Sequence, residues 1–289
     1  MPSSLPRPLA ELPVRRLTRS DLVACADLCE DRGWARDERR WGLLLAAGAG
    51  YGMDDPGGKG LMASCVVTSY DPDLAAVGML LVANRYARQG IARHLMERVL
   101  AEHGSTPLSL YATAAGQPLY ERLGFAVVGS AQRVTGRYLP GGEQPGDATV
   151  LPATAEDLRA MIELDSKVFG TDRTHLLARL PAFADHIRVA RVRGEIVGYA
   201  ALWPSGRAHV VGPLIAPDTD TAEALVAALA AATDLPLRAD IDARHSELLD
   251  RLERRGLLPS SATTVMTLGA PDLPGDWTRR YAPLTVATG

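Results

Sequence analysis

The sequence of 289 residues has few cysteines, few aromatic residues and no long hydrophobic run. Its three cysteines cannot all pair with one another, and their spacing matches no zinc-binding pattern, so neither a disulfide framework nor a zinc site is expected. No apolar run approaches the roughly 18 residues that span a bilayer, and the proline-interrupted first residues lack the apolar core of a secretory signal. These absences favour a protein of the reducing cytoplasm.

Charge and composition exclude two further classes of protein. The formal net charge of −3 and the sequence pI near 6.1 give no overall electrostatic attraction to nucleic acid or to an anionic membrane. The hydrophobic fraction of 47% is typical of a globular chain and argues against disorder or a fibrous repeat. At about 100–200 residues per domain, the length predicts two domains or one large one.

Alternating strand and helix patterns predict an α/β fold in each half of the chain. Crowded proline, glycine and polar residues between Leu139 and Asp147 predict a linker, which divides the chain into domains 1–140 and 141–289, the second with a C-terminal tail. The segment 48–60 is predicted to form turns. Strands are expected at 61–70, 74–82, 108–112, 187–193, 196–203, 208–215 and 237–241, a further strand is expected from 125, and helices are expected at 22–31, 36–47, 91–104, 118–123, 221–232 and 246–255.

The two halves repeat one pattern. The run ERLGF at 121–125 matches ERRGL at 253–257, an offset of 253 − 121 = 132. The same offset superposes the predicted helices 91–102 and 223–234, and it carries Gly90 to Ala222. The sequence therefore predicts two copies of one α/β unit in tandem.

The turn between the strand 74–82 and the helix 91–104 is the most informative segment. Free backbone N–H groups in the first turn of a helix, together with the helix dipole, favour an anionic ligand. Gly90 and Ala92 are small enough to admit phosphate oxygens to the backbone, and Arg88 and Arg93 add positive charge. An ordinary helix N-terminus with solvated arginines is equally compatible with the local composition.

A second informative segment, LYATAAGQPLYERLGF, carries Tyr120 one turn before Gly124. Taken alone, a tyrosine in this position is more often a half-buried packing residue than a catalytic one. Cys25 and Cys29, spaced to share one face of a helix, are likewise more compatible with packing than with redox chemistry.

The order of a strand, the turn VANRYARQGIA, a helix, a strand and PLYERLGF resembles the GNAT family of acyl-CoA-dependent N-acetyltransferases over roughly residues 14–138. The resemblance implies two tandem GNAT-like domains, each a mixed, mostly antiparallel sheet flanked by helices. It also implies acetyl-CoA as the co-substrate and no metal ion. In this family the glycine-rich turn holds the coenzyme A pyrophosphate, and the preceding strand pairs with the pantetheine arm.

Carried over by position, the resemblance implies that Tyr120 is the general acid that protonates the departing thiolate. It implies a coenzyme-binding set that combines the strand end, the turn and one later residue: Leu80, Leu81, Val82, Arg88, Gln89, Gly90, Ile91, Ala92, Arg93 and Thr113. Two positions depart from the family pattern. Ala87 stands where members usually have arginine, with Arg85 or Arg88 as candidates to supply that charge, and Thr113 stands where many have asparagine.

The implied reaction is direct transfer of an acetyl group to the amine of a small molecule or peptide. Glu30, Asp31 and Glu38 are candidates for assisting deprotonation of that amine, although solvation at the surface is the simpler explanation for each. The rival interpretation is a non-catalytic acyl-CoA-binding or interaction module, which Ala87 favours. A nucleotide-phosphate binder is a weaker option because the sequence has no strand-linked GxGxxG or Walker motif.

The second copy is predicted to be degenerate. Its turn carries Asp218 and Asp220, whose negative charge would repel a pyrophosphate, and the position equivalent to Tyr120 is Leu252. We expect a structural role for it, such as covering the acceptor side of the first copy. The scattered histidines are expected to pack or to lie at the surface. No nucleic acid or membrane partner is expected, both a monomer and a homodimer are compatible with the repeat, and the alanine- and arginine-rich composition suggests a bacterial genome.

Overall fold

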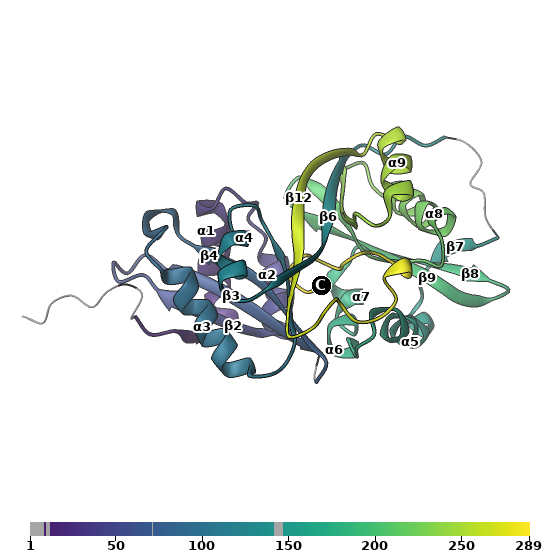
Figure 1. Cartoon of the computed structure of the whole chain (residues 1–289). Coiled ribbons are helices and arrows are strands. Elements are labelled where there is room, and N and C mark those ends of the chain that lie inside the picture. Colours follow the sequence, from purple (N-terminus) through teal and green to yellow (C-terminus); the bar gives the residue numbers. More distant parts are fainter. Residues whose placement is uncertain (1–8, 10–11, 71, 142–146) are drawn as a thin grey trace, which may run out of the picture.

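The described residues form one continuous mixed sheet with helices packed on its faces (Figure 1). The computed structural model describes residues 9, 12–70, 72–141 and 147–289. The middle of the predicted linker between Leu139 and Asp147 lies outside these residues. The sheet has 13 strands in the order β1-β2-β3-β4-β5-β12-β6-β11-β10-β9-β8-β7, and β13 pairs with β10 outside this path.

The first half of the chain contributes six strands and four α-helices to the described structure. They are β1 (Arg15–Leu17), α1 (Leu22–Asp31), α2 (Glu38–Ala47), β2 (Ala49–Asp54), β3 (Leu61–Tyr70), β4 (Leu74–Val82), α3 (Ile91–His103), β5 (Leu108–Ala112), α4 (Gln117–Arg122) and β6 (Ala126–Gly136). A short 3-10 helix, η3 (Asn84–Tyr86), precedes α3.

The second half repeats the succession of strands and helices and then adds an extended tail. Its elements are β7 (Thr149–Pro152), α5 (Leu158–Phe169), α6 (Thr174–Leu177), α7 (Leu180–Phe183), β8 (His186–Val192), β9 (Glu195–Ser205), β10 (Ala208–Ile215), α8 (Thr219–Ala230), β11 (Leu237–Asp242), α9 (Ser246–Arg254), β12 (Leu258–Leu268) and β13 (Arg280–Ala282).

The two halves exchange their last long strands. β12 of the second half pairs with β5 of the first, while β6 of the first half pairs with β11 of the second. β6 and β12 also pair with each other along most of their length, and Figure 1 shows them running side by side between the halves. Because each half completes the sheet of the other, the two units share backbone hydrogen bonds and not only a side-chain interface.

A bulge opens the sheet in the first half. β4 and β5 pair in parallel only from Ala75 to Val77, and the register of β4 against β3 then shifts. Met79 lies in the bulge with φ 53°, and Ser64 Oγ donates a hydrogen bond to its carbonyl oxygen at 3.1 Å. The edge of β4 that faces β5 therefore has no strand partner beyond Val77, although β3 still covers the other edge.

The corresponding opening in the second half is filled by the chain itself. β10 and β11 pair in parallel only at His209, Val210 and Val211. Beyond that point β13 pairs with Leu214 and Ile215 of β10 in antiparallel register. The tail that follows β13 is buried between the halves, where Ala287 packs against Gly78 of β4.

Hydrophobic packing is continuous across the two halves. Cysteine, tryptophan and leucine side chains of α1 and α2 form one cluster, and the buried face of α3 forms another with β3 to β5. A third cluster joins Tyr70 and Leu74 of the first half to Phe169 and Leu177 of the second. The halves thus share a core as well as strands.

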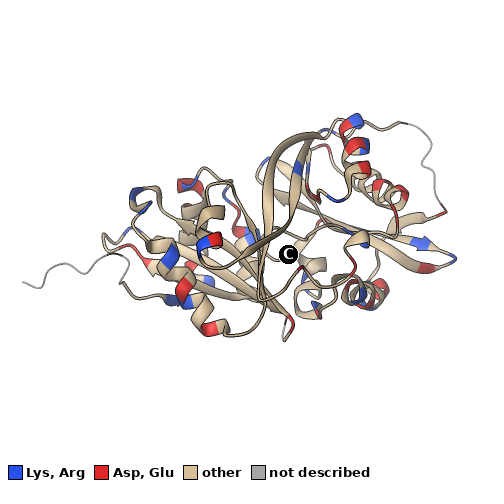
Figure 2. Cartoon of the chain, viewed as in Figure 1, with Lys and Arg blue, Asp and Glu red and all other residues tan. Residues whose placement is uncertain are grey.

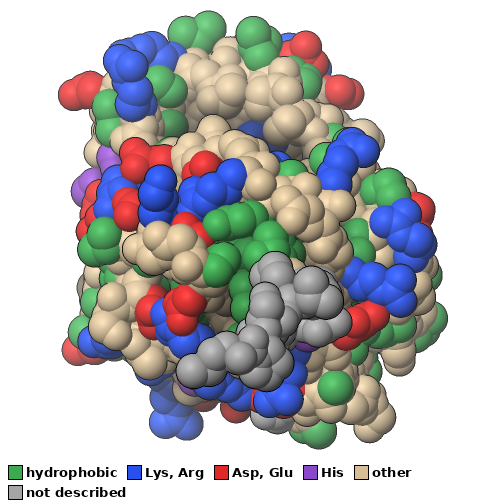
Figure 3. Space-filling model, turned by 90° about the vertical axis from the view of Figure 1, so that its left-hand side faces the viewer, with side chains coloured by type: hydrophobic (Ala, Val, Ile, Leu, Met, Phe, Trp, Pro, Cys, Tyr) green, Lys and Arg blue, Asp and Glu red, His purple; other side chains and the backbone are tan. Residues whose placement is uncertain are grey.

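The charged residues belong mostly to the helices and loops (Figure 2). Figure 3 views the molecule from the side of the first half, where acidic and basic side chains are interspersed around a central hydrophobic area. Neither sign of charge dominates this face, in keeping with the small net charge of the chain.

One prediction of secondary structure was wrong, and one long strand was not predicted. The predicted turn segment 48–60 contains the strand β2, because Tyr51 and Met53 alternate with glycines that pack on Leu17. Only Asp55–Gly60 of it is a turn, as expected for the Gly57–Gly60 run. The long strand β12 was not predicted, since many of its residues are polar and its first five residues are exposed.

The single repeat offset of 132 is also wrong for one helix. α8 begins at Thr219, which follows the start of α3 at Ile91 by 128 residues. Asp218, and not Ala222, therefore occupies the N-cap position that Gly90 has in the first half. The offset of 132 does hold at α4 and α9, where Phe125 N–H donates to the Tyr120 carbonyl oxygen and Leu257 N–H donates to that of Leu252.

Candidate functional site

A pocket of about 1170 Å³ lies where β4 and β5 diverge beyond Val77, an opening that we call the splay. Of the eleven residues singled out from the sequence, ten line it, and Gln89 does not. Its wall also includes residues of the α1–α2 loop, of β12 and of the tail after β13. The predicted turn, strand end and tyrosine thus come together in space, although they are up to 40 residues apart in the sequence.

The start of α3 offers uncapped backbone donors to this pocket. Gly90 is the N-cap residue with φ 79°, a left-handed conformation that glycine adopts without strain, and no side chain caps the helix. The first N–H groups of an α-helix have no partner within the helix. Gly90, Ile91, Ala92 and Arg93 line the pocket, so these donors and the positive end of the helix dipole lie at its wall.

Arg88, and not Arg85, adds positive charge beside the backbone N–H groups of Gly90 to Arg93, which we call the cradle. Arg85 donates to buried Asp55 at 2.6 Å and does not line the pocket, whereas Arg88 does. Asp55 also accepts hydrogen bonds from Gly57 N–H at 2.8 Å and from the Tyr86 hydroxyl. These bonds, with that of Tyr86 foremost, lower the pKa of Asp55 to about 2.

Asp55 is a residue whose role the sequence analysis missed. It ties the β2–β3 turn to η3, and η3 leads directly into the cradle, so its carboxylate positions the turn that precedes α3. The sequence signal was the run Asp54-Asp55-Pro56, which indicates a turn but not the distant partners of its carboxylate.

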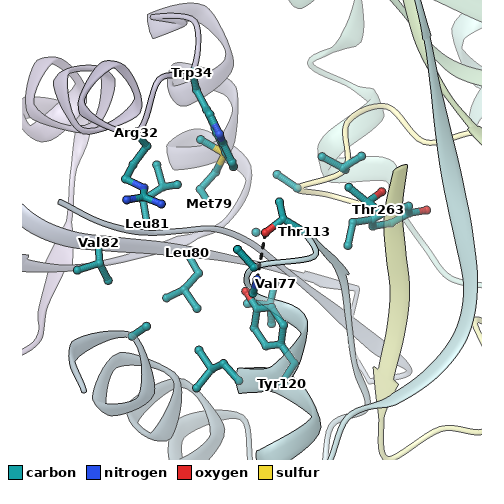
Figure 4. A pocket seen from close by; sticks show the side chains of 18 of the residues that line it. Arg32, Trp34, Val77, Met79, Leu80, Leu81, Val82, Thr113, Tyr120 and Thr263 are labelled. Atoms are coloured by element: carbon teal, nitrogen blue, oxygen red, sulfur yellow. Dashed lines mark hydrogen bonds between the residues drawn. The ribbon is translucent and has the colours of Figure 1, made fainter. Parts of the chain in front are cut away.

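Tyr120 lies on α4, and its ring points from that helix toward β4 (Figure 4). The side chain is 9% exposed and packs edge-on against Phe125, with ring centroids 5.8 Å apart. Burial raises the pKa of the phenol above its usual value, so the hydroxyl is protonated at neutral pH. No residue of the described chain is recorded as a hydrogen-bond partner of this hydroxyl, which leaves it available to a ligand.

Thr113 follows β5 and faces the same space (Figure 4). Its Oγ1 accepts a hydrogen bond from Gly116 N–H at 3.2 Å, at the start of α4. The hydroxyl proton is not used in that bond and can be donated into the pocket.

None of the three carboxylates considered as bases reaches the pocket. Glu30 and Glu38 both pair with Arg36, at 2.9 and 2.7 Å, and Asp31 accepts from Asn84 N–H at 2.6 Å. Each is solvent-exposed. The simpler explanation, a surface role, is the one that the geometry favours.

The second half lacks an equivalent cradle. Asp218 Oδ1 accepts from Thr221 N–H at 2.7 Å, so the carboxylate itself caps α8. Arg251 pairs with Asp220 at 2.6 Å, and Leu252 is fully buried. Because β13 fills the gap beside β10, the described residues of the second half offer no counterpart of the uncapped helix start, the unpaired strand edge or Tyr120 of the first half.

The cysteines are buried and unpaired. Burial raises the pKa of the thiols of Cys25 and Cys65 to about 12. Trp41 Nε1 donates to Cys29 Sγ at 3.2 Å within the core. These thiols pack as small apolar groups and are poor nucleophiles.

The described residues contain no group of three or more histidine, cysteine, aspartate or glutamate side chains that could hold a metal ion. Several histidines have structural partners. For example, His209 Nδ1 contacts Thr233 Oγ1 at 2.7 Å, and His245 stacks on Tyr281. Among the residues that the structure describes, no helix is long and apolar enough to cross a membrane.

Comparison with family models gives two matches in tandem. The model for an acetyltransferase (GNAT) domain matches residues 65–139, and another model of the same description matches residues 161–282. The chain belongs to the GNAT acetyltransferases. As a GNAT protein it is an acetyltransferase enzyme built from two domains of this family.

Two kinds of relatives agree with this assignment. The curated protein named Uncharacterized N-acetyltransferase YitH, from Bacillus subtilis (strain 168), is 29% identical over 232 residues, which are 79% of this chain and 82% of that protein. A solved protein of Pyrococcus horikoshii shares the fold over 100% of this chain and 99% of its own, with a TM-score of 0.79 and 16% identity. A tandem GNAT protein from the clavulanic acid biosynthesis pathway matches over 91% of this chain and 100% of its own, with a TM-score of 0.62 and 14% identity.

Proposed function

We propose that the first half of this GNAT protein transfers an acetyl group from acetyl-CoA directly to the amine of a small molecule or peptide. The observation that carries the proposal is the continuous pocket that runs from the uncapped start of α3, along the unpaired edge of β4, to the free hydroxyl of Tyr120. The chemical groups fit the co-substrate, because amide donors suit a diphosphate and a free strand edge suits the amides of pantetheine.

Each residue has a defined task in this proposal. The N–H groups at Gly90 to Arg93, with Arg88, hold the pyrophosphate, and Leu80 to Val82 pair with the pantetheine arm. A backbone N–H near Leu81 donates to the thioester carbonyl oxygen, where negative charge develops during attack. Tyr120 donates its proton to the sulfur as the bond between carbon and sulfur breaks.

Proximity supplies the remaining rate enhancement. Holding the amine beside the thioester converts a bimolecular step into an effectively intramolecular one. The amine nitrogen forms the new bond to the carbonyl carbon, and its proton passes to water, since no carboxylate or histidine of the described residues lines the pocket. Water then returns a proton to the phenolate of Tyr120.

We divide the chain into domains 1–140 and 141–289, and we assign a structural role to the second domain. Asp218 and β13 occupy the places where a pyrophosphate and pantetheine would bind, so we expect a single coenzyme site per chain. The three buried, unpaired thiols fit the reducing cytoplasm that we propose as its location.

One observation favours a second candidate, an acyl-CoA-binding module without catalytic activity: within the described part of the chain, no carboxylate or histidine lines the pocket to act as a general base. Only the transferase would form an acetylated amine, so this product distinguishes the two candidate functions. Purified protein is incubated with acetyl-CoA and a broad panel of amines, and acetylated amine is measured by mass spectrometry. Amine-dependent formation of an acetylamide supports the transferase, whereas tight acetyl-CoA binding without transfer to any amine supports the binding module.

The residue assignment is tested with a matched pair of variants on one helix. Gly90→Glu places a carboxylate in the cradle at the start of α3, whereas Gly104→Glu places it at the other end, at a position with φ 57° and no neighbouring atom within 4 Å. We expect Gly90→Glu to abolish acetyl-CoA binding and Gly104→Glu to retain it. Equal binding by both variants would refute the location of the pyrophosphate site.

A further inference from the structure

The charged residues of the pocket wall are all cationic. No aspartate or glutamate of the described chain lines the pocket. Seven arginines do: Arg32, Arg40, Arg88, Arg93, Arg122, Arg133 and Arg238. Arg88 and Arg93 lie at the start of α3, where the proposed coenzyme site uses them. Arg40, Arg133 and Arg238 come from α2, β6 and β11, so their presence needs another explanation.

These three arginines lie at the end of the pocket remote from α3. α3 follows β4, and β5, β12 and β6 all lie between β4 and β11 in the sheet. Arg133 is opposite Ser261 of β12 and Asp240 of β11 in the strand register. Figure 4 shows Thr263 of β12 on the opposite side of the pocket from Val82, with Tyr120 and Thr113 between them. The three arginines are therefore on the side of Tyr120 that is away from the proposed pyrophosphate site.

Hydrogen bonds connect the two halves at this end. Asp37, the N-cap residue of α2, accepts a hydrogen bond from Ser205 Oγ of β9 at 2.8 Å. Arg238 Nη2 is 3.4 Å from the same Ser205 Oγ, and Arg40 Nε is 3.8 Å from Asp37 Oδ2. Arg40 of the first half and Arg238 of the second are thus held around one polar contact between the halves.

Two of the three guanidinium groups are incompletely satisfied. Arg133 makes a bidentate ion pair with Asp240, at 2.8 and 3.2 Å. In contrast, Arg238 has no ion pair with any described carboxylate, and its buried Nε has no hydrogen-bond acceptor. The Nε of Arg40, although 3.8 Å from Asp37 Oδ2, and the Oγ1 of Thr263 are also buried without a hydrogen-bond partner. Unpaired buried donors are costly, and a bound anion would remove that cost.

The local balance of charge also favours an anion. Three guanidinium groups face only two carboxylates, those of Asp37 and Asp240. Burial, followed by the positive charges of Arg133 and Arg40, lowers the pKa of Arg238 to about 10, and the two carboxylates oppose this. The guanidinium remains charged at neutral pH, so an oxyanion beside it would relieve both its desolvation and the repulsion from its neighbours.

We propose that this end of the pocket binds an anionic oxygen group carried by the acceptor amine, with Arg238 and Arg40 as its principal ligands. The inference rests on the proposed function and narrows its acceptor to amines that also bear a carboxylate or a phosphate. The planar, forked donors of arginine match both groups. The same positive charge disfavours a purely cationic acceptor such as a polyamine. It also gives the second half a role in specificity, because Arg238 and Ser205 belong to it.

The proposal is tested with matched acceptor pairs that differ only in the anion. One arm compares α-, β- and γ-amino acids with their carboxamides, and the other compares aminoalkyl phosphates with the corresponding amino alcohols. Release of coenzyme A is followed with a thiol reagent. We expect the charged member of at least one pair to have a kcat/KM about tenfold or more above its neutral partner, the size of one hydrogen bond to a charged group. The arm that shows the preference identifies the anion. Equal kcat/KM in every pair would overturn the proposal.

Variants assign the preference to the arginines. Arg238→Gln and Arg40→Gln are expected to raise KM for the charged acceptor about tenfold or more while leaving KM for acetyl-CoA and for the neutral acceptor nearly unchanged. The control, Arg159→Gln, removes one charge from an exposed side chain of α5 that does not line the pocket, and it should change neither constant. If Arg238→Gln raised KM for acetyl-CoA instead, this end of the pocket would be part of the coenzyme site and the proposal would be wrong.

A binding measurement separates this proposal from the proposed function. Calorimetry in the presence of coenzyme A compares an N-acetylated amino acid with its N-acetylated amide, in the native protein and in Arg238→Gln. Preferential binding of the acid that is lost in Arg238→Gln supports the anion site even if no amine is acetylated, a result that would refute only the transferase. Acetylation of neutral and anionic amines at equal rates, with no preferential binding of the acid, would refute only the anion site.

Discussion

Tyr120→Phe tests the proposed general acid with little disturbance of the fold. The substitution removes one hydroxyl for which no hydrogen-bond partner is recorded, and it keeps the ring that packs against Phe125. We therefore expect the free energy of unfolding to change by less than about 1 kcal/mol. A variant of Tyr138, Tyr138→Phe, is a matched control, because Tyr138 does not line the pocket.

The expected kinetic effect follows from the leaving group. General acids contribute about 10²- to 10⁴-fold, and a thiol with a pKa of about 8.5 needs less assistance than an alkoxide. We therefore expect kcat to fall about 100-fold, equivalent to about 2.7 kcal/mol in the activation free energy. KM for acetyl-CoA should change less than about threefold, since other groups hold the co-substrate.

Steady-state kinetics with a saturating acceptor measure both constants, and a pH profile adds a second criterion. Because burial raises the pKa of Tyr120, the phenol stays protonated as the pH rises, and no loss of kcat from its ionisation is expected up to about pH 10. An unchanged kcat in Tyr120→Phe would refute the acid role, and so would an equal fall in kcat for Tyr138→Phe.

Three further predictions concern the turn, the thiols and the exchanged strands. The folded-state pKa of Asp55, about 2, lies below its unfolded value of 3.8, so its contribution to stability is present above about pH 4 and is lost as the pH falls toward 2. The difference in unfolding free energy between the native protein and Asp55→Asn should therefore shrink over that range, and a constant difference would contradict the assigned pKa. The three buried thiols should not react with a thiol reagent in the native protein and should all react after unfolding, whereas rapid reaction of the native protein would show that they are accessible. Residues 1–140 and 141–289 expressed as separate chains should be unfolded or aggregated when alone and should regain the native circular dichroism spectrum on mixing, because β5 and β11 each pair with a strand of the other half. A stably folded, monomeric first half would contradict this.

Much of the first half could be predicted from its sequence. Apolar runs bounded by turn residues predicted β3 and β4. The helical spacing of apolar residues in 91–103, between Gly90 and Gly104, predicted α3. The cradle, the strand end and Tyr120 were recognised because their order along the chain is a local pattern. Their convergence on one pocket then follows from the parallel pairing of β4 with β5.

The exchange of β6 and β12 could not be predicted. Both strands are long and partly polar, and nothing local to either sequence distinguishes pairing with its own half from pairing with the other. The pairing of β13 with β10, in the opening between β10 and β11, could not be predicted for a related reason. Three residues, Arg280–Ala282, are too few for a periodic signal, and their place is determined by a strand edge far away in the sequence.

The anion-binding end of the pocket was likewise invisible in the sequence. Arg40, Arg133 and Arg238 are separated by about a hundred residues each and belong to no motif. Only the tertiary arrangement shows that Arg133 has a carboxylate partner, whereas Arg238 has none among the residues that the structure describes. The four-residue shift at α8 was missed for a simpler reason, since weak similarity between the halves does not reveal where the offset between them changes.

The most direct test of the account is the stoichiometry of acetyl-CoA binding, measured by calorimetry with the intact chain and with Gly90→Glu. One site per chain is expected in the native protein, and no binding is expected in the variant. Two sites per chain, or one site that persists in Gly90→Glu, would show that the diphosphate does not bind at the start of α3.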